Sequence, residues 1–206
     1  MTETRIPTQK RSIEKRNKII SKGFELMCNK GYHKTKTTDI AKYAGVSTGI
    51  IYQYFNDKKE IFIAGARQYS NAIMFPVLSL IDEEAKLPPN LEDFFQKIIK
   101  TNKSQHTSSK KAHQELTAMQ HLDEDVELIF KESELAFSNK LYNLFKNNNF
   151  NTKDLKEKTH LIVNLIDSLA HEEVYHKHNS LNYNTMEKIV IKMILSILKK
   201  WYNQKL

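Results

Sequence analysis

The sequence predicts an all-α fold of about nine helices. Apolar residues make up 40% of the 206 residues, but the chain has only five glycines and four prolines, so residues that break helices are scarce. Apolar side chains also recur three and four positions apart, as on one helix face, and no segment is a convincing strand. We expect a flexible tail over residues 1–10, a three-helix domain over 11–57 and a larger helical domain over 58–206.

The N-terminal domain contains two short helices joined by a tight turn. A stripe of apolar side chains predicts a first helix over residues 11–30. Thr37 is a suitable N-cap for a second helix, because its hydroxyl can accept a hydrogen bond from a free backbone amide. Gly45 can then adopt the left-handed conformation that ends a helix, and Ser47 can cap a third helix. This order predicts a helix-turn-helix motif.

Positive charge is concentrated around this motif. Residues 1–62 contain 13 Lys or Arg and 6 Asp or Glu, a net charge of +7, whereas residues 63–206 contain 19 and 18, a net charge of +1. A basic surface that only kept the protein soluble would not be confined to one segment. The asymmetry is typical of a protein that binds nucleic-acid phosphates.

The motif also follows a family pattern. The residues that carry it are Thr37, Thr38, Ile40, Ala41, Ala44, Gly45, Val46, Ser47, Gly49, Tyr52, Tyr54, Phe55 and Lys58. In this order they resemble the DNA-binding end of the tetracycline-repressor (TetR/AcrR) family of bacterial transcriptional regulators. The resemblance covers about residues 10–65. It implies a C-terminal helical domain that binds a ligand and forms a dimer.

The second helix of such a motif enters the major groove with its N-terminus first, so its outward side chains are candidate DNA contacts. Gln53 could pair with adenine, and the Thr48 methyl group could contact a thymine methyl. Gly49 would let the helix backbone approach DNA closely. The resemblance implies phosphate contacts for Tyr52 and Tyr54, although both could instead be partly packed aromatics. The full predicted set is Lys36, Thr37, Thr38, Ser47, Thr48, Gly49, Tyr52, Gln53, Tyr54 and Lys58.

The remaining helices follow from the apolar periodicity, and a polar run over 101–111 is expected to be a loop. One helix of about 15 residues should follow Asn90. The others are predicted over residues 58–84, 110–121, 122–146, 153–178 and 185–204.

One helix-turn-helix makes few contacts, so we expect a homodimer on a palindromic double-stranded DNA operator. The last two predicted helices carry wide apolar bands, which suit either a subunit interface or the core of one subunit. The candidate interface residues are Leu161, Leu165, Leu169, Ile194, Leu198 and Trp201.

The middle helices are rich in aromatic and methionine side chains. The resemblance implies that they enclose a cavity for a small effector, and these side chains would suit an apolar or aromatic molecule. They could equally fill a core. The candidate ligand-binding residues are Phe62, Tyr69, Phe94, Phe95, Met119, Phe130, Phe137 and His171.

No catalytic arrangement is present, so we expect neither an enzyme nor a cofactor. The segment from His171 to His176 resembles a zinc motif, but its second histidine comes one residue late, so no metal site is expected there. The single cysteine and the lack of an apolar run of ~20 residues suit a cytoplasmic protein.

These observations predict a homodimeric, sequence-specific DNA-binding transcriptional regulator, a repressor that a small-molecule ligand releases from its operator. Two alternatives remain open. One is a regulator that a metal or a partner protein switches through the C-terminal domain, and the other is an enzyme or carrier that retains the helix-turn-helix.

Overall fold

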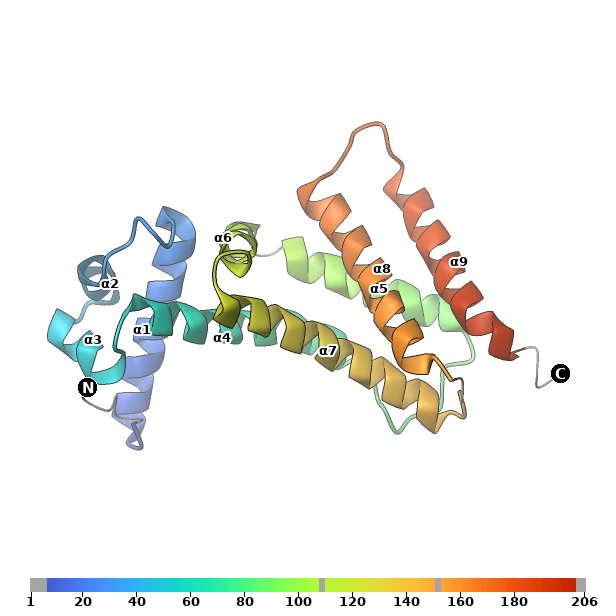
Figure 1. Ribbon diagram of the computed structural model, residues 1–206, viewed down its shortest axis with the longest axis horizontal. Coiled ribbons are helices and arrows are strands. Elements are labelled where there is room, and N and C mark those ends of the chain that lie inside the picture. Colours follow the sequence, from blue (N-terminus) through green and yellow to red (C-terminus); the bar gives the residue numbers. More distant parts are fainter. Residues whose placement is uncertain (1–6, 108–109, 151–152, 203–206) are drawn as a thin grey trace. The chain divides into compact units, whose positions relative to one another are not determined.

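The computed structural model describes the backbone of residues 7–107, 110–150 and 153–202, and side chains as far as Leu198. Within these ranges the chain forms nine α-helices and no strand, which confirms the predicted all-α fold (Figure 1). None of these helices combines the length and apolar character needed to cross a lipid bilayer. The helices are α1 Lys10–Lys30, α2 Thr37–Ala44, α3 Thr48–Tyr54, α4 Lys58–Leu78, α5 Leu91–Thr107, α6 Lys110–Gln120, α7 Glu124–Asn147, α8 Leu155–Tyr175 and α9 Tyr183–Tyr202.

The chain divides into two compact units. Unit 1 consists of Met1–Ser70 and Lys111–Phe130, and unit 2 consists of Asn71–Lys110 and Lys131–Leu206. Helices α4 and α7 therefore contribute residues to both units. The functional boundary between residues 57 and 58 stays a prediction.

Unit 1 is built on one apolar core. Its side chains come from α1 to α4, and also from α6 and the start of α7, through Leu116, Met119 and Val126. Gly65 of α4 allows α1 to pack closely, because a Cβ atom at this position would lie 2.4 Å from Cβ of Phe24. The predicted helix-turn-helix thus rests on residues that come some 50 or more positions later in the chain.

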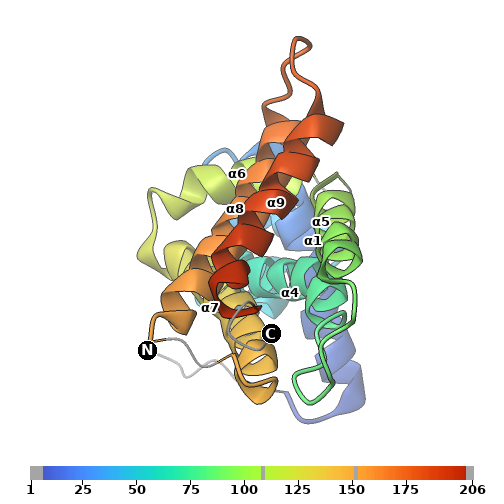
Figure 2. The same cartoon turned by 90° about the vertical axis from the view of Figure 1, so that its right-hand side faces the viewer.

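Unit 2 has a core of its own, in which α5 and α9 both pack on α8. Helices α8 and α9 lie side by side, as Figures 1 and 2 both show. Lys103 of α5 joins the three helices, since its Nζ lies 2.6 Å from Glu173 of α8 and 2.7 Å from Glu187 of α9.

The expected loop over residues 101–111 is wrong at residues 101–107, which belong to α5, and at residues 110–111, which belong to α6. Helix α5 continues through this polar run, because Asn102 and His106 are turned into the interior of unit 2. Residues 108–109 lie outside the described residues, as do residues 1–6 of the expected tail. Polar composition misled the prediction because it does not reveal which side of a helix is buried.

Three helix ends also differ from expectation. The helix expected to reach residue 84 ends at Leu78, and Lys140 Nζ donates to the carbonyl oxygens of Leu78 and Ile81. Helix α8 ends at Tyr175 and not at residue 178 as expected, so His176 lies beyond the helix that carries His171. Thr37 is the first residue of α2 and not its cap.

Lys36, the residue before α2, is hydrogen-bonded to a side chain of that helix. The backbone N–H of Lys36 donates a 3.0 Å hydrogen bond to Asp39, which also lies 2.6 Å from Lys30 Nζ. A carboxylate in the first turn interacts favourably with the free amides there, so Asp39 supplies the stabilisation expected from Thr37.

Candidate nucleic-acid interface

The turn between α2 and α3 has the predicted construction. Gly45 adopts φ 66° and ψ 42°, the left-handed conformation that costs glycine little. The N–H of Val46 returns to the carbonyl oxygen of Ala41 at 3.0 Å. Ser47 caps α3, where its hydroxyl oxygen accepts from the N–H of Ile50 at 3.4 Å. The local sequence therefore fixes the direction in which α3 leaves the turn.

Helix α3 is buried on one side and exposed on the other. Ile51 and Phe55 lie in the core of unit 1, as expected from their spacing. Tyr52 is 54% exposed, and Gln53 is also exposed. This helix therefore presents polar and aromatic side chains to solvent in the manner of a recognition helix.

Gly49 lies in the first turn of α3 and has no packing reason to be glycine. A Cβ atom there would meet only the Ser47 hydroxyl, at 4.0 Å. Its φ is not in the left-handed region either. Glycine in a helix costs about 0.5–1 kcal/mol relative to alanine. The missing side chain leaves room on the exposed side of the helix, where a binding partner would approach.

The positions predicted to contact DNA fall into two groups by exposure. Thr37, Thr48 and Tyr54 are half-buried, and Tyr54 packs against the core of unit 1. The exposed residues of the set are Lys36, Thr38, Ser47, Gly49, Tyr52 and Gln53.

Lys58 is engaged with its own chain. Its Nζ donates to the carbonyl oxygens of Tyr32 at 2.7 Å and Thr35 at 2.9 Å, and it lies 4.4 Å from the centre of the Tyr32 ring. Desolvation by burial lowers the pKa of this ammonium. Because an ammonium has three N–H donors, one remains for a phosphate oxygen. Lys58 therefore also stabilises the segment between α1 and α2.

Sequence reasoning missed the support that α6 and α7 give to these helices. Glu115 of α6 accepts a 2.6 Å hydrogen bond from the N–H of Tyr32. Lys59 at the start of α4 lies 2.8 Å from both Asp123 and Asp125. The charged side chains carry no periodic signal that links them to residues more than 60 positions away.

The eight predicted ligand-binding residues are divided between the units. Four of them, Phe62, Tyr69, Met119 and Phe130, pack in unit 1. The other four, Phe94, Phe95, Phe137 and His171, belong to unit 2. Two surface hollows of unit 2 are lined mainly by polar residues, and none of the eight lines either one. The aromatic side chains in both units mainly fill cores.

The predicted interface residues are also divided. Leu169, Ile194 and Leu198 lie in the core of unit 2, and Leu165 packs against it. Leu161 is 51% exposed. Two apolar side chains of α9 that sequence reasoning did not select, Ile189 and Met193, are also exposed, at 51% and 46%. The side chain of Trp201 lies outside the described residues.

A basic helix-turn-helix at the start of an all-helical chain is typical of one class of bacterial transcription regulators, and comparison with known proteins agrees. Residues 19–64 match the family model of bacterial regulatory proteins, tetR family. The resemblance to the TetR family that the sequence predicted is thereby confirmed.

Curated relatives match the same end of the chain. The HTH-type transcriptional regulator HbdR of Aromatoleum sp. (strain CIB) is 50% identical over 48 residues, 23% of this chain and 21% of its own length. The fatty acid metabolism regulator protein of Bacillus subtilis (strain 168) is 44% identical over 46 residues, 22% of this chain and 24% of its own. The chain therefore spans less than a quarter of the length of these two relatives.

Solved structures share the fold over nearly the whole chain. A TetR-family regulator from Mesorhizobium loti MAFF303099 has a TM-score of 0.71 at 17% identity and covers 93% of this chain and 98% of its own. FadR from Bacillus subtilis, solved in complex with stearoyl-CoA, has a TM-score of 0.61 at 20% identity over 87% and 97% of the two chains. These proteins are described as transcriptional regulators and not as enzymes, which is the class that the sequence predicted.

Proposed function

We propose that this chain is a homodimeric, sequence-specific DNA-binding transcriptional regulator, a repressor that a small-molecule ligand releases from its operator. The observation that carries the proposal is the basic helix-turn-helix, whose residues 19–64 match the tetR family model. The exposed side of α3 supports it, since Gly49, Tyr52 and Gln53 are all open to solvent. Binding to an operator places the regulator in the cytoplasm.

The DNA contacts follow from chemistry and from position in the helix-turn-helix segment, and all of the proposed residues except Thr48 and Lys58 are exposed. Gln53 and Thr48 read base edges in the major groove, where a glutamine amide can pair with adenine and a methyl group can contact thymine. Lys36, Thr38 and Tyr52 contact phosphates, which fixes the register of α3. Lys58 adds its remaining N–H donor to a phosphate while it holds the segment after α1.

Dimerisation provides the second recognition helix. Two-fold symmetric regulators bind half-sites about 34–36 Å apart, one helical turn of DNA. The exposed apolar side chains of α8 and α9, Leu161, Ile189 and Met193, support a subunit interface on these helices. An interface of this kind buries apolar side chains that would otherwise face water.

The effector is an apolar or aromatic small molecule that binds the helical unit 2. A ligand with a long apolar chain is supported by two comparisons that both point to Bacillus subtilis: the sequence relative is described as a fatty acid metabolism regulator, and the structural neighbour FadR was solved with stearoyl-CoA. We accordingly propose acyl-CoA thioesters as the first compounds to test. A ligand releases DNA only if it binds the DNA-incompetent state more tightly, and a coupling of about 1–3 kcal/mol changes operator affinity about 5- to 150-fold.

The test measures binding of the purified full chain to its operator. Sites selected from random DNA give the sequence, and fluorescence anisotropy gives the affinity with and without a series of acyl-CoA thioesters. We expect two chains per operator and a lower affinity when a thioester binds. If a thioester binds the protein and operator affinity does not change, the proposal that this ligand releases the repressor from DNA is wrong. The proposal that the chain binds DNA is not affected by that result.

A further inference from the structure

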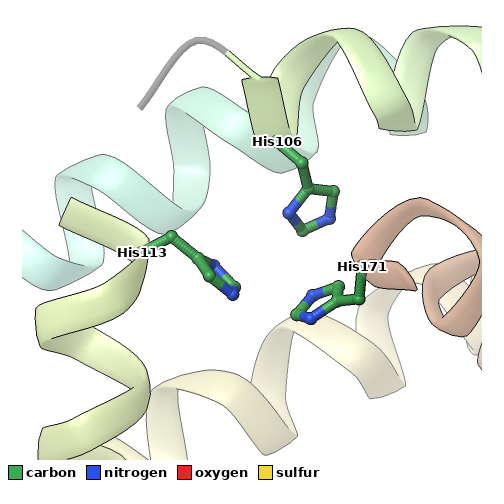
Figure 3. Close-up of side chains that lie close together, drawn as sticks. All are labelled: His106, His113 and His171. Atoms are coloured by element: carbon green, nitrogen blue, oxygen red, sulfur yellow. The ribbon is translucent and has the colours of Figure 1, made fainter. Parts of the chain in front are cut away.

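Two histidines and one aspartate come together in unit 2, where His106 is buried and Asp167 and His171 are partly exposed. His106 comes from α5, and Asp167 and His171 come from successive turns of α8. The Nε2 atom of His106 lies 3.3 Å from Oδ1 of Asp167, and Nε2 of His171 lies 3.4 Å from Oδ2 of the same carboxylate. The centres of the two imidazole rings are 4.6 Å apart. Figure 3 shows the two rings together, and it also draws His113, which belongs to unit 1.

We propose that His106, Asp167 and His171 form a binding site for a divalent transition-metal ion such as Zn²⁺. Imidazole nitrogens and carboxylate oxygens are ligands that this class of ion prefers. Three protein ligands leave a coordination position open for water or for another donor. The site does not rest on the proposed function, because metal binding can be measured on the chain without DNA.

The separations between the candidate ligand atoms suit one ion. Zinc lies about 2.0–2.2 Å from nitrogen and oxygen ligands, so tetrahedral coordination places two ligand atoms about 3.4 Å apart. The His106 Nε2–Oδ1 and His171 Nε2–Oδ2 distances are 3.3 and 3.4 Å, so an ion between the imidazoles would bind the Asp167 carboxylate through both oxygens or through one. The ligand nitrogens of His106 and His171 lie within 4.8 Å of each other, so only a small ring movement would bring both to one ion.

Tyr175 supplies the outer contact that metal-binding histidines usually have. Its hydroxyl donates a 2.8 Å hydrogen bond to the carbonyl oxygen of His106, and its oxygen lies 3.4 Å from Nδ1 of the same residue. A proton on Nδ1 can point to this oxygen, which leaves the Nε2 lone pair for a metal ion. Tyr175 therefore orients His106 through the nitrogen that the metal does not use.

Asn102 lies beside the site. It is one turn before His106 on α5 and is only 2% exposed. Its side chain hydrogen bonds to Asp167. Asn102 therefore helps to position the carboxylate between the two imidazoles.

The test is calorimetric titration of the full chain with Zn²⁺ after treatment with a chelator, together with the visible spectrum of the Co²⁺ form. We expect one ion per chain and Co²⁺ bands of low-symmetry nitrogen and oxygen coordination. His171→Gln and Asp167→Asn should each weaken Zn²⁺ binding by about 100-fold or more, because the loss of an outer contact alone costs about 10- to 100-fold.

The matched control is His160→Gln. His160 lies 3.4 Å from Glu134 and so forms a histidine–carboxylate pair in the same unit, but without a second imidazole in that pair. This variant should bind Zn²⁺ as the natural chain does. Absence of saturable Zn²⁺ binding to the natural chain, or equal binding by all variants, would overturn the proposal. Circular dichroism identifies a variant that fails to fold. In that case the Co²⁺ spectrum of the natural chain decides whether nitrogen and oxygen ligands bind the metal.

Discussion

The backbone N–H of Tyr32 donates a 2.6 Å hydrogen bond to the carboxylate of Glu115, which lies 83 positions later in the chain. This contact joins the segment after α1 to α6 within unit 1. Lys59 and Asp123, at 2.8 Å, make a second connection of the same kind. Helix α6 and the start of α7 thus share the core that supports the helix-turn-helix, so we expect substitutions in α6 to change the stability of this motif.

The first prediction concerns Glu115. Glu115→Ala leaves the N–H of Tyr32 without its acceptor, and we expect the free energy of unfolding to fall by about 1–3 kcal/mol. Urea denaturation followed by circular dichroism measures the change. Gln114→Ala is the control, since Gln114 is an exposed neighbour on the same helix. Equal losses in the two variants would show that the hydrogen bond adds nothing.

The second prediction compares two glycines. Gly49→Ala should raise stability by up to about 1 kcal/mol, because the new methyl group meets open space and the helix loses a glycine. It should also weaken operator binding about tenfold or more, since the methyl group occupies the side that faces DNA. Thermal unfolding and fluorescence anisotropy measure the two effects.

Gly65→Ala is the matched control for Gly49→Ala. Its methyl group would lie 2.4 Å from Cβ of Phe24, so we expect a loss of about 1–3 kcal/mol from overpacking. Unchanged operator affinity in a stable Gly49→Ala variant would mean that this side of α3 does not face DNA.

The third prediction separates phosphate contacts from base contacts. Lys36→Ala should weaken binding to operator and random DNA equally and reduce the slope of log K against log salt by about 0.9 for each chain. Gln53→Ala should instead relax the preference at one base pair, which costs about 1–3 kcal/mol on the operator. Anisotropy titrations at several salt concentrations test both, and identical behaviour of the two variants contradicts the assignment.

The fourth prediction concerns the pH dependence of Asp39. Its hydrogen bond from Lys30, and then that from the N–H of Lys36, lower the pKa of this carboxyl below its usual value. A lowered pKa stabilises the folded chain above the unfolded pKa, and this contribution disappears as pH falls through the folded pKa. Asp39→Asn should therefore be less stable than the natural chain at pH 7, and the difference should shrink in acid. If the stability difference between Asp39→Asn and the natural chain does not change with pH, the lowered pKa of Asp39 is not its cause.

Much of the helix-turn-helix could be predicted because its signals are local. Gly45 and Ser47 determine backbone geometry within a few residues, and the spacing of Ile51 and Phe55 identifies the buried side of α3. The same local reading failed at Thr37, where Asp39 provides the hydrogen bond to the residue before α2. Thr37 and Asp39 both have side chains that can accept a hydrogen bond from a free amide at the start of α2. The sequence alone does not show which of the two does so.

The interior of unit 2 could not be predicted in this way. The polar run around Asn102 and His106 indicated a loop, but these side chains are buried because Asp167 and Tyr175 of α8 provide hydrogen-bonding partners for His106. Sequence reasoning grouped His171 with the histidines that follow it, whereas the structure pairs it with His106, 65 positions earlier. Side-chain pairs between distant helices depend on helix packing, which a single sequence does not encode locally.

Operator binding by the natural chain tests the central claim most directly. After selection from random DNA, anisotropy at fixed salt compares the enriched sequence with a scrambled one of the same composition. The account predicts a palindromic site bound by two chains, with an affinity at least about 10³-fold above that for the scrambled DNA. Equal affinity for the two sequences, or no enriched sequence at all, would contradict it.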